Sequence, residues 1–163
     1  MVEQKLGSFE ALQTSTFKNG TVYQTYVTDQ RLVAVKTGGQ MDGGRAVTNH
    51  FGALGAIIGY FIEKRVQKKR AALRLANEAR TLDELLLQDP KNFEVRFEAL
   101  EKAELLKAGM MVPGKANLVL TLTGGAKDPI KLNLQSKESL AVALPLLEQG
   151  LAGRLQTDPK LRA

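Results

Sequence analysis

The sequence predicts an α+β fold, mainly β, in which antiparallel strands are covered by a C-terminal helix and interrupted by a helical insertion. Three observations support this prediction. Short β-rich runs occur in pairs, a single amphipathic helical pattern follows the last pair, and a long glycine-rich and basic segment lies between the pairs. Strands followed by one closing helix are typical of a small antiparallel sandwich or barrel with one open end covered.

The first pair of strands is predicted at residues 21–27 and 31–35. Both runs, TVYQTYV and RLVAV, are rich in β-branched and aromatic residues, and the TDQ between them supplies a polar turn. Asn19-Gly20 predicts an earlier turn, because this dipeptide favours positive φ. The run TGGQMDGGR after Lys36 predicts a mobile loop.

A helical pattern from Phe51 to Arg80 has two different halves. Phe51 to Ile62 carries no charge, whereas Glu63 to Arg80 holds seven basic and two acidic residues. The net charge of this segment, +5, accounts for most of the chain's +6, so the basic character is local to one predicted helix. The residues expected to contact a partner or a membrane are Gly52, Gly55, Gly59, Phe61, Lys64, Arg65, Lys68, Lys69 and Arg70.

Several partners are compatible with these two halves. The glycines and alanines of the uncharged half leave a surface on which another helix can pack closely. This predicts packing on the domain or self-association, with shallow membrane contact as the alternative. The basic half suits anionic lipid headgroups or nucleic-acid phosphates, and a solvated helix face explains it as well. No aromatic residue lies among the basic ones, which argues against binding of single-stranded nucleic acid.

The packed side of the basic helix is predicted from its apolar residues. Ile62, Val66, Leu73 and Ala76 share one side of a helical wheel, although Lys69 interrupts that stripe. Thr81, followed by a glutamate three positions later, predicts a capping box and a second, short helix that ends near Asp89-Pro90.

The remaining strands are predicted by alternation. Residues 93–98 alternate apolar and charged, as in a half-buried strand. Residues 98–108 favour a helix by composition, because Ala, Leu, Glu and Lys all have high helix propensity. Residues 118–122 and 130–134 place leucine or isoleucine at every second position, which predicts a hairpin.

A closing helix is predicted after Ser136, whose side chain can cap it. Pro145 lies inside this helix and is expected to kink it or delay its start. The tail from Thr157 is short and charged and is expected to fray. The apolar side of the helix is formed by Leu140, Leu144, Leu147 and Leu151.

The run YVTDQRLVAV resembles the T-D/N-x-R-L hairpin of bacterial pleckstrin-homology-like and GRAM-type domains. The matching residues are Thr28, Asp29, Arg31 and Leu32. FEVRFEALEKAEL resembles the next strand of that family and the turn that follows, which implies turn and strand at residues 98–108. The resemblance covers about residues 8–36 and 92–155.

This resemblance implies a single pleckstrin-homology-like antiparallel β-sandwich or barrel over residues 8–155. Its β segments are expected at about 8–36 and 92–135 and its closing helix at 136–155, with residues 37–91 inserted. Domains of this class bind phosphoinositides, other lipids or peptides. The shared hairpin residues define the fold, so no binding residue is carried over. The predicted loop at residues 18–20 has one lysine, which argues against inositol phosphate binding there.

The sequence offers few residues for catalysis. His50 is the only histidine and there is no cysteine, which leaves no histidine pair for a metal and no Ser-His-Asp arrangement with a choice of bases. The glycine-rich run at residues 38–45 lacks the GK[ST] ending of a phosphate-binding loop and is predicted to be a hinge. We therefore expect no enzyme activity, no cofactor and no metal site.

The predicted function is that of a non-catalytic binding or assembly module. Its insertion is expected to contact an anionic membrane lipid or a protein partner, and the alternative is a nucleic-acid-binding protein that uses the basic helix 63–80. The longest uncharged run would span about 18 Å as a helix, well short of the ~30 Å of a bilayer core. The start of the sequence lacks a secretory signal pattern. A cytoplasmic location, peripheral to the inner face of the membrane, is expected.

Overall fold

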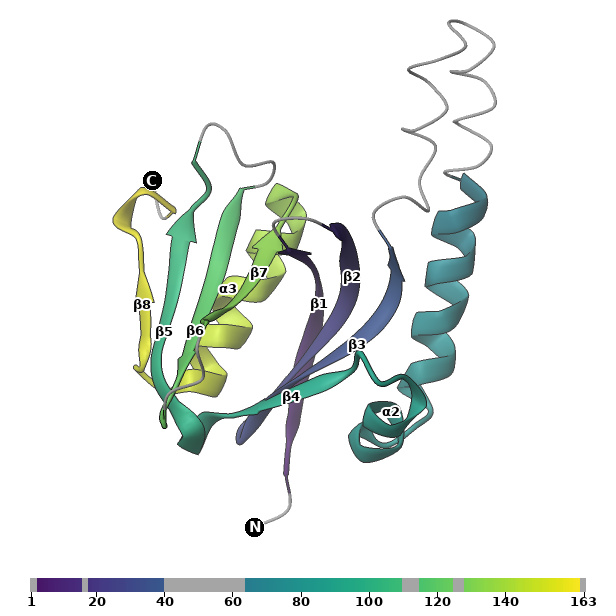
Figure 1. Ribbon diagram of the computed structural model, residues 1–163, viewed down its shortest axis with the longest axis horizontal. Coiled ribbons are helices and arrows are strands. Elements are labelled where there is room, and N and C mark those ends of the chain that lie inside the picture. Colours follow the sequence, from purple (N-terminus) through teal and green to yellow (C-terminus); the bar gives the residue numbers. More distant parts are fainter. Residues whose placement is uncertain (1–2, 16–17, 40–63, 110–114, 125–127, 162–163) are drawn as a thin grey trace, which may run out of the picture.

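The computed structural model describes residues 3–15, 18–39, 64–109, 115–124 and 128–161. Over these ranges the chain is an α+β fold built on one mixed sheet of eight strands, in the order β4-β3-β2-β1-β7-β6-β5-β8 (Figure 1). The strands are β1 Lys5–Ser15, β2 Lys18–Thr28, β3 Arg31–Gly39, β4 Phe93–Arg96, β5 Leu100–Lys107, β6 Ala116–Leu122, β7 Ile130–Leu134 and β8 Leu155–Thr157.

Three helices accompany this sheet in the described ranges. The first covers residues 64–78 and is called the basic helix below. The other two are α2 Leu82–Gln88 and α3 Lys137–Leu151, and short 3-10 turns occur at η2 Phe97–Ala99 and η3 Pro159–Leu161. Figure 1 shows the basic helix and α2 at the β3 end of the sheet, whereas α3 packs against β1, β2, β7 and β8.

The hairpin predicted at residues 21–27 and 31–35 is confirmed as β2 and β3. The turn predicted at Asn19-Gly20 is wrong, because both residues belong to β2 and Lys18 already pairs with Ser15 of β1. Residues 37–39, predicted to belong to a loop, are strand instead, since β3 continues to Gly39, which pairs with Thr21. β2 is long enough to offer ladder hydrogen bonds that far, and this pairing outweighs the low strand propensity of glycine. Residues 40–45 lie outside the described ranges.

The segment at residues 98–108 forms a 3-10 turn and then β5, as the family resemblance implied and against its helix propensity. β5 pairs with β6 on one side and with β8 on the other. Its inward residues Leu100, Ala103 and Leu105 are buried. Two strand partners and a buried face therefore outweigh the intrinsic preference of Ala, Leu, Glu and Lys for helix.

The β2–β3 part of the sheet is buried on both faces. Along β3, Leu32 and Ala34 join the main core, while Val33 and Val35 join a second cluster with Tyr26 and Leu85 of α2. Successive side chains of a strand point to opposite faces, so the unbroken apolar run LVAV reflects a strand covered on both sides. Helix α3 covers one face, and α2 packs on the other through Leu85.

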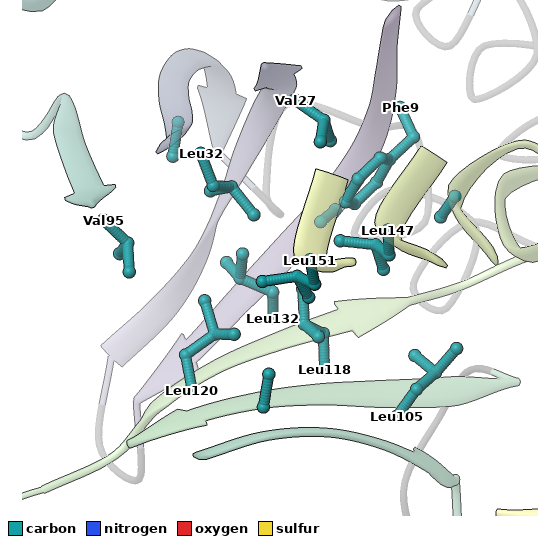
Figure 2. Close-up of a cluster of buried hydrophobic side chains, with 14 of the residues drawn as sticks. Phe9, Val27, Leu32, Val95, Leu105, Leu118, Leu120, Leu132, Leu147 and Leu151 are labelled. Atoms are coloured by element: carbon teal, nitrogen blue, oxygen red, sulfur yellow. The ribbon is translucent and has the colours of Figure 1, made fainter. Parts of the chain in front are cut away.

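Helix α3 closes the main core as the sequence predicted. The Ser139 amide donates to Ser136 Oγ at 3.0 Å, which confirms the predicted cap. Leu147 and Leu151 are buried, and Figure 2 shows them among Phe9, Leu118 and Leu132. Leu140 and Leu144 are half-buried at the edge of this core. Pro145 does not delay the helix, which starts at Lys137 and includes it.

The C-terminal segment is paired with the sheet, so the prediction that the tail frays from Thr157 is wrong. β8 runs parallel to β5, with Leu155 opposite Ala103 and Thr157 opposite Leu105. Just beyond β8, the Asp158 amide donates to the carbonyl oxygen of Leu105 at 2.9 Å. These backbone bonds hold the tail, although its charged composition gave no sign of a strand.

Candidate functional site

The residues predicted to contact a partner fall in two groups. Lys64, Arg65, Lys68, Lys69 and Arg70 lie on the basic helix, which stands beside β3 and α2 (Figure 1). The other predicted contact residues, Gly52, Gly55, Gly59 and Phe61, lie outside the described residues, as do Ile62 and His50. The candidate site is therefore built from the basic helix and the strand ends beneath it.

The basic helix turns a polar side toward the sheet. Asn77 is buried, and Val66, Arg70 and Arg74 are half-buried. The predicted packing stripe is wrong in part, because Ala76 is exposed and Leu73 is 39% exposed. The surface beneath the helix explains the difference, since it carries charged and hydrogen-bonding side chains that attract arginine rather than leucine.

Charged contacts fasten this polar side to the sheet. Arg74 forms an ion pair with Glu10 of β1, and an Arg70 guanidinium nitrogen donates to the carbonyl oxygen of Gly39 at 3.1 Å. At the other end of the helix, Lys5 Nζ lies 2.5 Å from Glu78 and 4.5 Å from the centre of the Tyr26 ring. The helix is thus held to the sheet by polar contacts at three positions along its length, Arg70, Arg74 and Glu78.

Some polar atoms in this interface lack a hydrogen-bond partner among the described residues. They are Gln24 Oε1, Tyr26 Oη, Arg70 Nε and Arg74 Nε. Tyr26 is fully buried, and burial, reinforced by the nearby Glu78, raises the pKa of Tyr26 to about 12. An unsatisfied buried donor or acceptor costs about 1–3 kcal/mol, so this interface is weaker than an apolar one of the same area.

The opposite side of the basic helix combines positive charge with an exposed leucine. Lys64, Lys68, Ala71 and Leu75 follow one another at i, i+4, i+7 and i+11, so they form one line along the helix, called the outer stripe below. All four are exposed, and the Leu75 side chain is 75% exposed. Leu75 was not part of the apolar stripe predicted for this helix, and the sequence pattern did not single it out as a surface residue.

A cavity of about 390 Å³ lies between the basic helix and the end of β3. This volume falls within the range of small-molecule sites. The cavity is called the basic pocket below, and its lining residues are Lys36, Thr37, Gly38, Val66, Lys69, Arg70, Leu73 and Asp89.

A larger cavity of about 600 Å³ lies near the turn between β2 and β3 and the end of α3. Its central cation, Arg31, is surrounded by carboxylates: Glu94 at 2.5 Å, and Glu3 and Asp83 at 2.7 Å. These contacts raise the pKa of Arg31, chiefly through its hydrogen bond to Glu3, and lower the pKa of Glu94, chiefly through its hydrogen bond to Arg31. Three carboxylates thus already engage Arg31, which leaves it a structural role.

The T-D-x-R-L residues have structural roles in this turn. Thr28 Oγ1 accepts from the amides of Gln30 and Arg31 at 3.0 and 2.8 Å and donates to the Arg31 carbonyl. Asp29 accepts from the amide of Gln4 at 2.9 Å. The side chains of the motif therefore fix the hairpin. This agrees with the expectation that the shared hairpin residues define the fold and do not bind a ligand.

The described ranges contain neither a metal-binding cluster nor a membrane-spanning helix. No cluster of three or more histidine, cysteine or carboxylate side chains suited to a metal ion occurs there. None of the helices in those ranges has both the length and the apolar character needed to cross a bilayer.

Comparison with protein-family models, curated proteins and solved structures found no match.

Proposed function

We propose that the protein is a non-catalytic binding module that associates with anionic lipid at a membrane surface through the outer stripe of its basic helix. We further propose a pleckstrin-homology-like architecture, in which β1–β4, β5–β7 and α3 follow the order of strands and closing helix implied by the T-D-x-R-L resemblance. In this arrangement the basic helix belongs to an insertion between β3 and β4.

The observation that carries the proposal is the orientation of the basic helix. Arg70 and Arg74 point toward the protein, while Leu75 and two lysines point away from it. A soluble helix normally buries its apolar residues and exposes its charges. A helix that exposes a leucine in line with two lysines suits an interface where the leucine enters the headgroup region and the lysines meet lipid phosphates.

The expected strength of this contact is modest. Each lysine near an anionic leaflet contributes about 1 kcal/mol, and burial of a leucine side chain contributes about 1.5–3 kcal/mol. The outer stripe has two lysines and one leucine. Binding should therefore be reversible and weakened by salt, as for a peripheral protein at the inner, anionic face of a membrane.

Flotation of the protein with vesicles tests this proposal. We expect binding to vesicles of phosphatidylcholine and phosphatidylglycerol at low salt, and none to phosphatidylcholine alone. Lys64→Gln with Lys68→Gln should weaken the binding, whereas Lys131→Gln with Lys137→Gln, exposed lysines of β7 and α3, should leave it unchanged.

A DNA and RNA shift assay at the same salt concentration distinguishes the nucleic-acid alternative. Retardation of nucleic acid without vesicle flotation would favour that alternative over the membrane proposal. If the Lys64/Lys68 variant and the Lys131/Lys137 variant lost the same amount of vesicle binding, net charge, rather than the outer stripe, would determine that binding. The oligomeric state, measured in the same samples, tests self-association through the glycine-rich segment.

A further inference from the structure

The basic pocket is formed by two parts of the chain that are distant in sequence. The end of β3 supplies Lys36, Thr37 and Gly38, and the basic helix supplies Lys69 and Arg70. Asp89, the residue that ends α2, completes the wall. The pocket therefore exists only when the helix is docked on the sheet.

The charges of the basic pocket are not balanced. Lys36 Nζ lies 3.0 Å from Asp89, so these two groups compensate one another. The pKa of Asp89 is lowered by the Lys91 amide and by Lys36, so the Asp89 carboxylate is ionised at neutral pH. Lys69 and Arg70 form no ion pair with any residue in the described ranges. Within the described ranges the pocket thus carries two positive charges that no ion pair compensates.

Arg70 also has unused hydrogen-bonding capacity. One guanidinium nitrogen donates to the Gly39 carbonyl, but Nε is buried and has no acceptor among the described residues. A buried donor of this kind is stabilised when an anionic acceptor reaches it, and hydrogen bonds to a charged acceptor are the stronger ones. Arg70 lines the pocket, so its guanidinium can donate hydrogen bonds to an oxyanion ligand there.

We infer that the basic pocket binds a phosphate monoester, held by Lys69, Arg70 and Lys36. A phosphate monoester carries about −1.5 to −2 charges at neutral pH, which matches the two uncompensated cations better than a carboxylate or a phosphodiester does. Val66 and Leu73 on the helix side of the pocket provide apolar contact for the carbon atoms of the ester. The monoester could be a lipid headgroup or a soluble metabolite.

This inference rests on the proposed function only if the phosphate monoester belongs to a lipid; binding of a soluble monoester does not require membrane association. The membrane source is tested with vesicles that contain either phosphatidate, a monoester, or phosphatidylglycerol, a diester, adjusted to the same zeta potential. We expect about tenfold tighter binding to phosphatidate, the equivalent of one additional charge-assisted hydrogen bond. A surface that responds to charge alone would bind both vesicles equally.

Two double variants show which residues produce the preference for phosphatidate over phosphatidylglycerol. Lys69→Gln with Arg70→Gln removes the cations of the pocket, and Lys64→Gln with Lys68→Gln removes the same charge from the outer stripe. The first should abolish the preference for phosphatidate, whereas the second should weaken binding to both vesicles and keep the preference. Lys69→Glu is a further pocket variant at an exposed side chain, so its effect does not depend on repacking of the helix.

The soluble source is tested by titration of glycerol 3-phosphate, with acetate at equal ionic strength as control, while backbone amide resonances are followed by NMR. Shifts at Thr37, Gly38 and Lys69 with the phosphate alone, lost in Lys69→Glu, would support the pocket even if no vesicle bound. That result would reject the membrane proposal and keep the pocket. Absence of both amide shifts and phosphatidate preference would overturn the pocket, whether or not vesicles bind.

Discussion

Arg74 of the basic helix forms an ion pair with Glu10 of β1, across 64 positions of the sequence. This pair, with the Arg70 contact to Gly39, fixes which side of the helix faces the sheet. Leu75 follows Arg74 directly, and a one-residue step turns a helix by about 100°, so a helix that turns Arg74 inward must turn Leu75 outward. The exposed leucine is a consequence of the inward-facing arginine.

Glu10→Gln should loosen the basic helix without unfolding the sheet. Both side chains of the pair are about 40% exposed, so an ion pair of this kind is worth under ~1 kcal/mol, and amide hydrogen exchange in residues 64–78 should accelerate by up to about fivefold. High salt should produce a similar acceleration in the unmodified protein. Glu101→Gln, at an exposed position of β5, is the control. Unchanged exchange in the Glu10 variant would show that the pair does not hold the helix.

Leu147→Ala should destabilise the whole domain. Leu147 is fully buried between α3 and the sheet, and loss of a buried leucine side chain typically costs about 2–5 kcal/mol. Val142→Ala on the same helix is the control, because Val142 is 49% exposed and surface changes usually stay within about 0.5 kcal/mol. Urea unfolding measures both. A loss below about half a kilocalorie per mole for Leu147→Ala would mean that α3 does not close the core at this point.

Gly150→Ala should also destabilise the fold, although alanine favours helix. A Cβ at position 150 would lie 2.7 Å from a methyl group of Val27 and 2.9 Å from the Thr28 carbonyl oxygen. Overpacking of this kind costs about 1–3 kcal/mol, against a gain of up to about 1 kcal/mol in helix propensity. Gly109→Ala is the control, since nothing lies within 4 Å of its added Cβ. A stabilised Gly150→Ala variant would show that α3 lies farther from β2.

The free energy of unfolding should depend on pH through the Glu94 carboxylate. Arg31 lowers the pKa of Glu94 from its ordinary value of 4.5, so the folded state binds this proton less readily than the unfolded chain. The resulting stabilisation is complete above the unfolded pKa and is lost as the pH falls through the folded one. The difference in unfolding free energy between the protein and Glu94→Gln should therefore be constant near pH 7 and shrink below about pH 4.5. A difference that stays the same down to pH 2–3 would contradict this assignment, since the usual range of a carboxyl would then have been crossed without effect.

Local patterns predicted the hairpins, the capping box at Thr81 and the closing helix. The capping box is present, with the Glu84 amide donating to Thr81 Oγ1 at 3.3 Å and the Thr81 amide donating to Glu84 at 2.8 Å. These features depend on a few neighbouring residues, so the sequence expresses them directly. The strand at residues 100–107 could be predicted only from the family resemblance, because its local preference is helical and its partners β6 and β8 lie later in the chain.

The basic residues of the candidate site were predicted from the sequence, but the side of the helix that packs on the sheet was not. The basic residues of the helix were recognised from their number, whereas the side that packs was assigned from Val66, Leu73 and Ala76. That assignment assumed an apolar surface beneath the helix. The surface instead presents Glu10, Gln24 and the edge of Tyr26, which come from two strands near the start of the chain. The basic pocket could not be predicted for the same reason, because it joins residues 36–38 to residues 66–73 and Asp89.

The most direct measurement uses the absence of cysteine from the chain. Leu75→Cys introduces a single thiol on the outer stripe, to which an environment-sensitive fluorophore is attached. On addition of phosphatidylglycerol vesicles at low salt, its emission should shift to the blue, because the label enters the apolar part of the headgroup region. The same label at Val142→Cys, on the exposed side of α3, should not respond. A shift at position 75 alone is the predicted result; equal responses at both positions, or none at position 75 while the protein floats with the vesicles, would contradict membrane contact through the basic helix.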